Sequence, residues 1–189
     1  LGGNAAQYRL AAATYLLQPG TPFIYYGEEI GMAGASANIG DDPKLRTPMS
    51  WAGDAKAGFT TGTPLRALSG NAASNNVAAQ SADPNSLLNF YKAVIAVRRA
   101  HPSLMAGTHA GATASGTTLS FQRVLGNERA VVMINYGGTT ANVTAAGLPA
   151  NSVLVNAFPA SGTDAAADAG GSATVGVPAQ SVRVFIITP

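Results

Sequence analysis

Residues 20–32 constrain the fold of this chain more than any other stretch of the sequence. They read Gly-Thr-Pro-Phe-Ile-Tyr-Tyr-Gly-Glu-Glu-Ile-Gly-Met, so a short apolar run leads directly into two adjacent acids. Residues 23–26 are apolar on both faces, which predicts a strand of a parallel sheet that is covered on both sides. One parallel strand cannot make a sheet, so the first hundred residues need neighbouring strands from elsewhere.

Helical signals flank this expected strand. Asn4 can cap a helix over residues 5–18, and Pro19-Gly20 ends it. The segment 27–82 shows little periodicity and predicts a long loop, which is uncommon inside a compact domain and is often functional.

A second helix is expected over residues 85–101. Asp83-Pro84 is typical of a helix start, since it places an acid at the cap and proline at the first helical position. Pro102 stops this helix. We place a domain boundary near residues 102–108.

After Leu104 the sequence consists of short runs of strand-forming residues separated by turn residues, which predicts an antiparallel β-sandwich. Gly126-Asn127 is typical of a hairpin turn. The Ala/Gly/Asp-rich residues 164–171 are expected to form an exposed loop. The expected strands are 118–125, 129–136, 141–144, 152–158, 173–177 and 182–188.

Composition excludes several function classes. Hydrophobic residues make up 47% of the 189 residues and charged residues 11%, which favours a packed core. The net charge is +2 and only Arg98-Arg99 are adjacent basic residues, which argues against nucleic-acid binding. There is no cysteine, which excludes disulfides and thiolate metal sites but is compatible with a secreted or periplasmic protein. No apolar run approaches about 18 residues, so no membrane span is expected.

Three motifs carry a family resemblance. Residues 20–29 resemble the eighth barrel strand of the α-amylase family of glycoside hydrolases. Arg-Thr-Pro-Met-Ser-Trp at 46–51 and Gly-Phe-Thr-Thr-Gly at 58–62 resemble the loop after that strand in its α-glucosidase-like members. The helix over 85–101 resembles the last barrel helix. The resemblance covers essentially the whole chain and implies an α/β plus all-β protein: residues 1–103 as the C-terminal part of an incomplete (β/α)8 TIM-type catalytic barrel, and 104–189 as a C-terminal β-sandwich.

The resemblance implies a retaining mechanism that uses three carboxylates. In the family these come from the fourth, fifth and seventh strands, so the catalytic residues are expected upstream of Leu1 and none is assigned here. The chain is therefore expected to be the C-terminal portion of a hydrolase that cleaves α-glucosidic bonds in starch- or maltooligosaccharide-type substrates. It should be inactive without the missing N-terminal barrel segment. No cofactor is implied.

Two pairs of candidate side chains come from the first motif. Glu28 and Glu29 follow the expected strand, where either one lines the cleft rim or makes a structural salt bridge. Adjacent residues point apart, so they cannot be the acid/base pair of a retaining enzyme, whose carboxyls lie about 5–5.5 Å apart. Tyr25 and Tyr26 alternate across the strand, so one of them can stack on sugar or pack in the core.

The second motif supplies two further candidates. A guanidinium such as that of Arg46 can donate paired hydrogen bonds to sugar hydroxyls or to a carboxylate. The alternative is that Arg46 forms a loop-stabilising ion pair with Asp41 or Asp42. Trp51, the only tryptophan, is either a sugar platform or an anchor of the loop.

Two positions depart from the family pattern. Ser50 stands where many relatives carry glutamine, and Leu65 stands where they carry tryptophan. Both changes remove side chains that pack or contact sugar near the cleft, so substrate preference stays open.

No metal site is expected. His101 and His109 are too few and too far apart in sequence for a site that needs three or four ligands. Asp164 and Asp168 lack the further oxygen ligands of a calcium loop.

Two other hypotheses remain. One is a non-catalytic carbohydrate-binding or structural β-sandwich module, although the aromatic residues after residue 108 fall mostly at inward positions. The other is self-association through residues 23–26, whose unpaired edges and apolar faces are a known liability.

Overall fold

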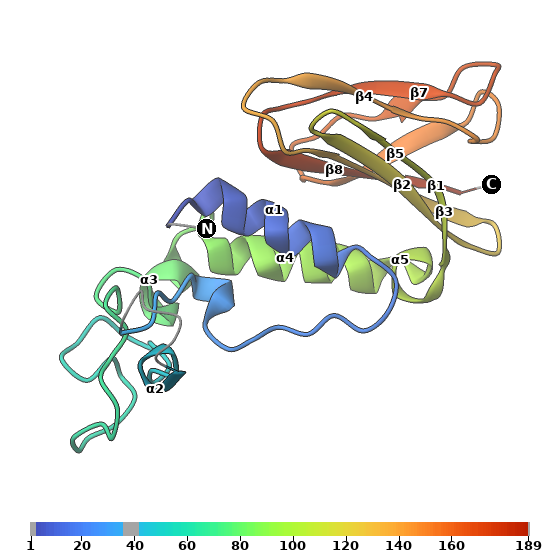
Figure 1. Cartoon of the computed structure of the whole chain (residues 1–189). Helices are drawn as coiled ribbons and strands as arrows, with labels where there is room; N and C mark the ends of the chain where they lie inside the picture. Colours follow the sequence, from blue (N-terminus) through green and yellow to red (C-terminus); the bar gives the residue numbers. More distant parts are fainter. Residues whose placement is uncertain (1–2, 36–41, 189) are drawn as a thin grey trace. The chain divides into compact units, whose positions relative to one another are not determined.

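The computed structural model describes residues 3–35 and 42–188. The chain forms two compact units (Figure 1). The first unit contains Leu1–Tyr8 and Phe23–Ala93, and the second contains Arg9–Pro22 and Val94–Pro189. Two helices, α1 (Ala5–Leu16) and α4 (Leu87–Ala100), contribute residues to both units.

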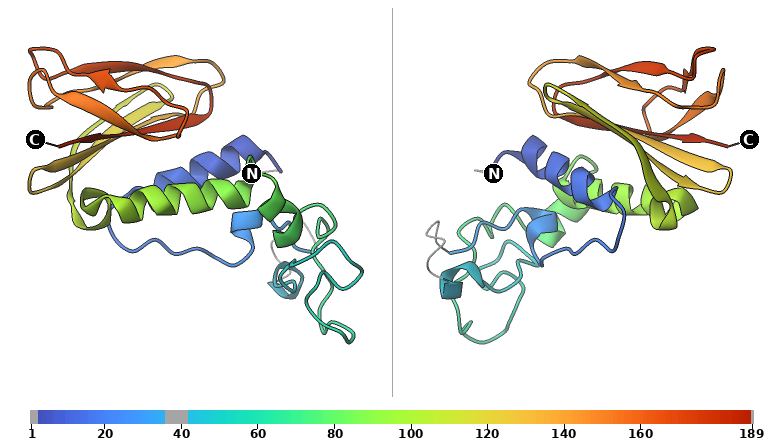
Figure 2. Two further views of the ribbon diagram at one scale, coloured as in Figure 1. Left: turned by 180° about the vertical axis from the view of Figure 1, so that it is seen from behind. Right: turned by 45° about the vertical axis from the view of Figure 1, so that its right-hand side comes forward.

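The second unit is built on two antiparallel sheets, which Figure 2 shows as stacked layers. The larger sheet has the strand order β1-β2-β3-β8-β5-β6, and the smaller pairs β4 with β7. Side chains from both sheets form one core, with Met133 and Phe185 from the larger and Val143 and Val177 from the smaller. The bounds are β1 Thr108–Ser115, β2 Thr118–Leu125, β3 Glu128–Asn135, β4 Ala141–Ala145, β5 Val153–Phe158, β6 Ala165–Ala166, β7 Ala173–Val177 and β8 Ser181–Ile187.

Most of the expected strands are present. β2 and β7 have the expected bounds, and the pairing of Leu125 with Glu128 confirms the Gly126-Asn127 hairpin turn. Sequence reasoning missed β1, whose small and polar residues are almost all exposed. The expected loop 164–171 is wrong in part, because it contains β6 and the buried Ala167.

The other face of the six-stranded sheet is buried as well, as Phe121 and Val132 show. The C-terminal half of α1 reaches the sheet within this unit. Thr14 Oγ1 lies 2.7 Å from Tyr136 Oη, and Arg123 Nη1 donates to the Leu17 carbonyl at 3.1 Å. The expected boundary between residues 103 and 104 stays a prediction.

The helix ends follow from specific capping contacts. Asn4 Oδ1 accepts from the Ala6 and Gln7 amides at 3.0 and 3.1 Å, which confirms the expected cap of α1. The helix α4 begins at Leu87 rather than at 85, because Ser86 Oγ accepts from the Asn89 amide at 3.1 Å. It ends at Ala100, before α5 (Pro102–Ala106).

The expected strand over 23–26 is wrong for the described chain. Residues 21–25 have no regular secondary structure, and Phe23 and Tyr25 are 88% and 58% exposed. The physical reason is the lack of partners, since every strand of the described residues pairs within the second unit. The apolar side chains expected to be covered on both sides are therefore open to solvent.

The segment 27–82 is largely irregular, as expected. It contains the single turn η1 (Glu28–Ile30) and the short helices α2 (Asp42–Leu45) and α3 (Val77–Ala82). Sequence reasoning missed α3 and placed Asp83 at the start of a helix, whereas Asp83 caps the end of α3. Among the described residues, no helix has both the length and the apolarity that crossing a membrane requires.

Amide side chains fix the acidic turn η1 in the first unit. Asn75 Nδ2 and Gln80 Nε2 both donate to the Ile30 carbonyl, at 3.0 and 2.7 Å. Asn71 Nδ2 donates to the Gly31 carbonyl at 2.9 Å. Backbone carbonyls of a loop are thus satisfied by side chains far along the sequence, which holds the turn in place.

Candidate functional site

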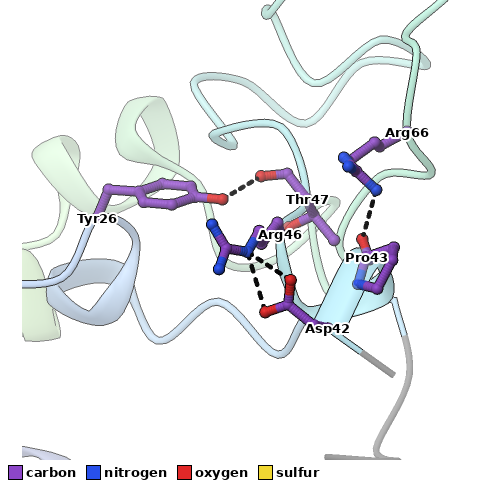
Figure 3. A network of polar contacts seen from close by, with 6 residues as sticks. All are labelled: Tyr26, Asp42, Pro43, Arg46, Thr47 and Arg66. Atoms are coloured by element: carbon purple, nitrogen blue, oxygen red, sulfur yellow. Dashed lines mark hydrogen bonds and ion pairs between the residues drawn. The ribbon is translucent and has the colours of Figure 1, made fainter. Parts of the chain in front are cut away.

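A hollow of about 370 Å3 in the first unit brings two of the expected site residues together. Tyr26 enters it from the segment before η1, and Arg46 enters it from the residue after α2 (Figure 3). The remaining lining comes from residues 47–49 and from the loop that contains Phe59. The described residues that line the hollow are Tyr26, Arg46, Thr47, Pro48, Met49, Phe59, Leu65 and Arg66.

Arg46 forms the expected pair with Asp42. Its Nε lies 3.0 Å from Asp42 Oδ1 and 2.8 Å from Oδ2, and both side chains are exposed. The hydrogen bond and the charge of Asp42 raise the pKa of the arginine, so it is fully charged. The terminal nitrogens Nη1 and Nη2 bond no described residue, and Figure 3 shows them directed away from Asp42. The other suggested partner, Asp41, lies outside the described residues.

Tyr26 is held by its hydroxyl, which donates to the Thr47 carbonyl at 2.9 Å. Its ring lies 4.9 Å from that of Tyr25, centroid to centroid. Desolvation and the neighbouring Tyr25 raise the pKa of the Tyr26 phenol, while the positive charges of Arg46 and Arg66 act in the opposite direction. The phenol is therefore neutral at physiological pH, and its oxygen keeps lone pairs for accepting a hydrogen bond.

Arg66 is a lining residue that sequence reasoning missed. Its Nη1 donates to the Pro43 carbonyl at 3.4 Å, so α2 contacts both arginines of the hollow. The neighbouring Leu65 is 99% exposed and Phe59 is 50% exposed. The sequence signal was the cation next to one of the family departures, at Leu65.

The acids Glu28 and Glu29 lie in η1 and do not line this hollow. Glu28 Oε1 accepts from the Tyr91 hydroxyl at 3.2 Å, which is a structural contact within the first unit. Glu29 Oε2 is buried without a hydrogen-bond partner among the described residues. Their expected place at a cleft rim stays a prediction.

The backbone of Trp51 forms hydrogen bonds that hold this residue in the loop. Its amide donates to the Ala57 carbonyl at 2.8 Å, and its own carbonyl accepts from the Ala78 amide at 3.0 Å. The side chain is 51% exposed and does not line the hollow. Ser50, where many relatives carry glutamine, is fully buried, and its Oγ has no partner among the described residues. Whether Trp51 serves as platform or anchor stays open.

Within residues 3–35 and 42–188, no group of three or more His, Cys, Asp or Glu side chains converges as a metal site would require. The hollow offers guanidinium donors, one phenol oxygen and apolar side chains. Such a set suits a polar ligand with an apolar face, such as a sugar. Its described lining holds no pair of carboxylates that could act as nucleophile and acid.

Comparisons with known proteins agree with the family resemblance. The sequence model described as "Alpha amylase, catalytic domain" matches residues 2–107. The oligo-1,6-glucosidase of Parageobacillus thermoglucosidasius is 30% identical over 177 residues, which is 73% of this chain and 32% of the relative. The trehalose synthase/amylase TreS of Mycobacterium tuberculosis is 41% identical over 115 residues, which is 57% of this chain and 19% of the relative.

Solved structures show the same fold over nearly the whole chain. The trehalulose synthase MutB of Pseudomonas mesoacidophila superposes with a TM-score of 0.78 at 24% identity, covering 97% of this chain and 38% of that protein. The isomaltulose synthase of Erwinia rhapontici, in complex with D-glucose, gives a TM-score of 0.76 at 23% identity. The expected fold class is thereby confirmed: a helical part that matches the catalytic domain precedes an antiparallel β domain. The chain spans well under half the length of these relatives.

Proposed function

Since the chain belongs to the alpha-amylase family, we propose that it is the C-terminal portion of a retaining glycoside hydrolase. The proposed substrates are starch- or maltooligosaccharide-type molecules with α-glucosidic bonds. The observation that carries this proposal is the hollow in which Tyr26 and Arg46 meet, on the segments that resemble the loop after the last barrel strand. The chain would supply one wall of the cleft.

The family resemblance implies that Arg46 lies near the leaving-group side of the cleft, and the chemistry of the hollow suits a sugar there. The two terminal nitrogens of Arg46, which bond no described residue, can donate to sugar hydroxyls, and Asp42 holds the guanidinium from the other side. The oxygen of Tyr26, which already donates to Thr47, can accept from a sugar hydroxyl. The exposed ring of Phe59 offers an apolar surface to a sugar face.

The carboxylates of the reaction must come from another part of the parent protein. A retaining enzyme needs two carboxyls about 5–5.5 Å apart. Glu28 contacts Tyr91, and neither Glu28 nor Glu29 lines the hollow. The chain alone is therefore proposed to be inactive, and its partner is the missing N-terminal barrel segment. The open residues 23–26 are where that segment would pair with this chain, and self-association through them is the competing outcome.

A second activity is supported by the relatives. The match to TreS is 41% identical, against 30% for the oligo-1,6-glucosidase, although it covers a shorter stretch. A synthase passes the glucosyl group to a sugar acceptor, whereas a hydrolase passes it to water. Hydrolysis is the proposed reaction, and transfer to sugar is the alternative.

A chimera tests the proposal. This chain replaces the matching C-terminal part of the Parageobacillus oligo-1,6-glucosidase, and the chimera is assayed with an aryl α-glucoside for aryl alcohol and free glucose. We expect hydrolysis by the chimera and none by this chain alone. Aryl alcohol without an equal amount of glucose would indicate transfer to sugar. Activity of this chain alone would contradict the proposal.

Variants of the chimera test the hollow. Arg46→Gln is expected to lower kcat/KM by about tenfold or more, because hydrogen bonds from a charged donor are lost. Lys92→Gln is the matched control, since Lys92 is an exposed cation of the first unit that does not line the hollow. NMR titration of this chain alone with maltotriose tests the binding-module hypothesis, which requires saturable signal shifts in residues 104–189 rather than at the hollow.

A further inference from the structure

The hollow carries two guanidinium groups whose positions depend on the same short helix. Arg46 bonds the carboxylate of Asp42 through Nε alone, and Arg66 bonds the carbonyl of Pro43 through Nη1 alone. Asp42 and Pro43 are the first two residues of α2. Each arginine therefore keeps N–H donors that bond no other described residue (Figure 3), and both arginines line the same hollow.

The charge of this surface is not balanced by the described residues. Asp42 is the one carboxylate that bonds either arginine among them, and it bonds only Arg46. None of the eight described lining residues is acidic. The positive charges of Arg46 and Arg66 both act on the Tyr26 phenol, although desolvation and Tyr25 raise its pKa overall, so both guanidinium groups lie near the Tyr26 side of the hollow. A neutral sugar would not need the second cation.

We propose that this hollow binds an oxyanion, so that the preferred glucoside carries a phosphate or carboxylate group on its leaving-group side. This inference rests on the proposed function, which makes the hollow part of a sugar cleft. Guanidinium groups bind carboxylate and phosphate through paired, charge-assisted hydrogen bonds. Arg66 is then the residue that determines specificity for the charged substituent, and Arg46 serves both the substituent and the sugar.

The rest of the lining suits the sugar that bears the anion. Tyr26 presents a hydrogen-bond acceptor, which would repel an anion but accepts from a sugar hydroxyl. Phe59 and Leu65 are exposed apolar side chains on the same hollow. The ligand should therefore combine an apolar sugar face, hydroxyls and one acidic group.

Binding to the full 189-residue chain tests this directly. The probes are glucose 6-phosphate, glucuronate, glucose and inorganic phosphate, and the readout is the shift of the Arg46 and Arg66 side-chain N–H signals in NMR. We expect at least one acidic sugar to bind about tenfold more tightly than glucose and more tightly than phosphate. The two acidic sugars distinguish phosphate from carboxylate recognition. Added salt should weaken binding of the acidic sugar but not of glucose.

Three variants sharpen the test. Arg66→Gln should abolish most of the preference for the acidic sugar, Arg66→Lys should retain part of it, and Lys92→Gln should leave it unchanged. Equal binding of the acidic sugar and glucose would overturn the proposal, and so would a preference that survives Arg66→Gln. Phosphate that binds as tightly as the acidic sugar would also overturn it.

The chimera provides a second readout and separates the two proposals. With a neutral aryl α-glucoside as substrate, glucose 6-phosphate or glucuronate should inhibit more strongly than glucose, and Arg66→Gln should remove this difference. A chimera that hydrolyses the substrate but shows no such difference would contradict the oxyanion site alone. A correctly folded chimera without any activity on α-glucosides would contradict the proposed function, whatever the binding data on the chain show.

Discussion

Arg98 donates from Nη2 to the carbonyl oxygen of Gly20 at 2.6 Å. Its Nη1 donates to the carbonyls of Leu16 and Gln18 at 2.5 and 2.8 Å. One guanidinium thus donates hydrogen bonds to carbonyl groups at and after the C-terminal end of α1, where no further helical turn supplies an N–H donor. The side chain is 6% exposed, and desolvation lowers its pKa. Arg98 therefore fixes the turn through which the chain leaves α1.

Replacing this arginine should destabilise the second unit. Arg98→Met leaves three carbonyl oxygens without their donor, so we expect the free energy of unfolding to fall by about 2–4 kcal/mol. Urea unfolding followed by circular dichroism measures it. The adjacent Arg99 is exposed, so Arg99→Met should change the free energy by less than about 0.5 kcal/mol. Equal effects of the two substitutions would contradict a capping role for Arg98.

Close backbone packing should make Gly107 intolerant of a side chain. A Cβ at this position would lie 2.4 Å from the Ser103 carbonyl oxygen and 2.9 Å from that of Val124. Its backbone conformation is one that alanine adopts readily, with φ at −67°, so Gly107→Ala tests the contact alone. We expect Gly107→Ala to lower the free energy of unfolding by about 1–3 kcal/mol. At Gly138 a Cβ meets nothing within 4 Å, so Gly138→Ala should be nearly neutral.

The secondary structure of the β half could be predicted from the sequence more accurately than that of the first hundred residues. In the β half the information is local: alternating apolar residues and the Gly126-Asn127 turn lead to the observed hairpin of β2 and β3. The strand expected over 23–26 depends on strands that the described chain does not contain, so the pattern alone could not produce it. β1 was missed because its residues are small or polar and almost all exposed, so the sequence shows no apolar alternation there.

The missed helix α3 depends on one buried amide. Asn76 Oδ1 accepts from the Ala79 amide at 2.9 Å, and its Nδ2 donates to the Ala72 and Ala73 carbonyls at 3.0 and 3.2 Å. Asn76→Ala removes the cap and both further hydrogen bonds, so we expect the free energy of local unfolding of α3 to fall by about 1–2 kcal/mol. Hydrogen exchange of the Ala79 amide reports it. Asn76→Asp keeps the acceptor and should lose less protection than Asn76→Ala; the reverse order would contradict capping by the side-chain oxygen.

The loop at Asp54 should show a defined pH dependence. Its Oδ1 accepts from the Gly58 and Lys56 amides at 3.1 and 2.8 Å, and these bonds lower the pKa of the carboxyl below its ordinary value of 3.8. The folded loop favours the charged form, so its stabilisation is present above pH 3.8 and is lost as the pH falls through the lowered pKa. NMR titration of the Asp54 carboxyl carbon measures it. A midpoint at or above the ordinary value would contradict these bonds, and Asp54→Asn should abolish the transition.

The candidate site was predictable only in part. The Arg46–Asp42 pair follows from the spacing of four residues across a single turn, which places the two side chains on one face. Arg66 joins the hollow through an irregular loop whose path no periodic pattern specifies, so the sequence offered only one signal, its position next to Leu65, where the chain departs from the family pattern. The expected roles of Glu28, Glu29 and Trp51 depend on surroundings beyond the described residues and remain predictions.

We propose that this chain supplies a cleft wall and depends on a separate barrel segment for catalysis. The most direct measurement is the initial rate of aryl α-glucoside hydrolysis by three samples: this chain, the N-terminal part of the Parageobacillus relative, and the two joined as the chimera. We expect hydrolysis only by the joined protein, at a rate that Arg46→Gln lowers and Lys92→Gln leaves unchanged. Turnover by this chain alone, or the same rate for the relative's N-terminal part with and without this chain, would contradict it.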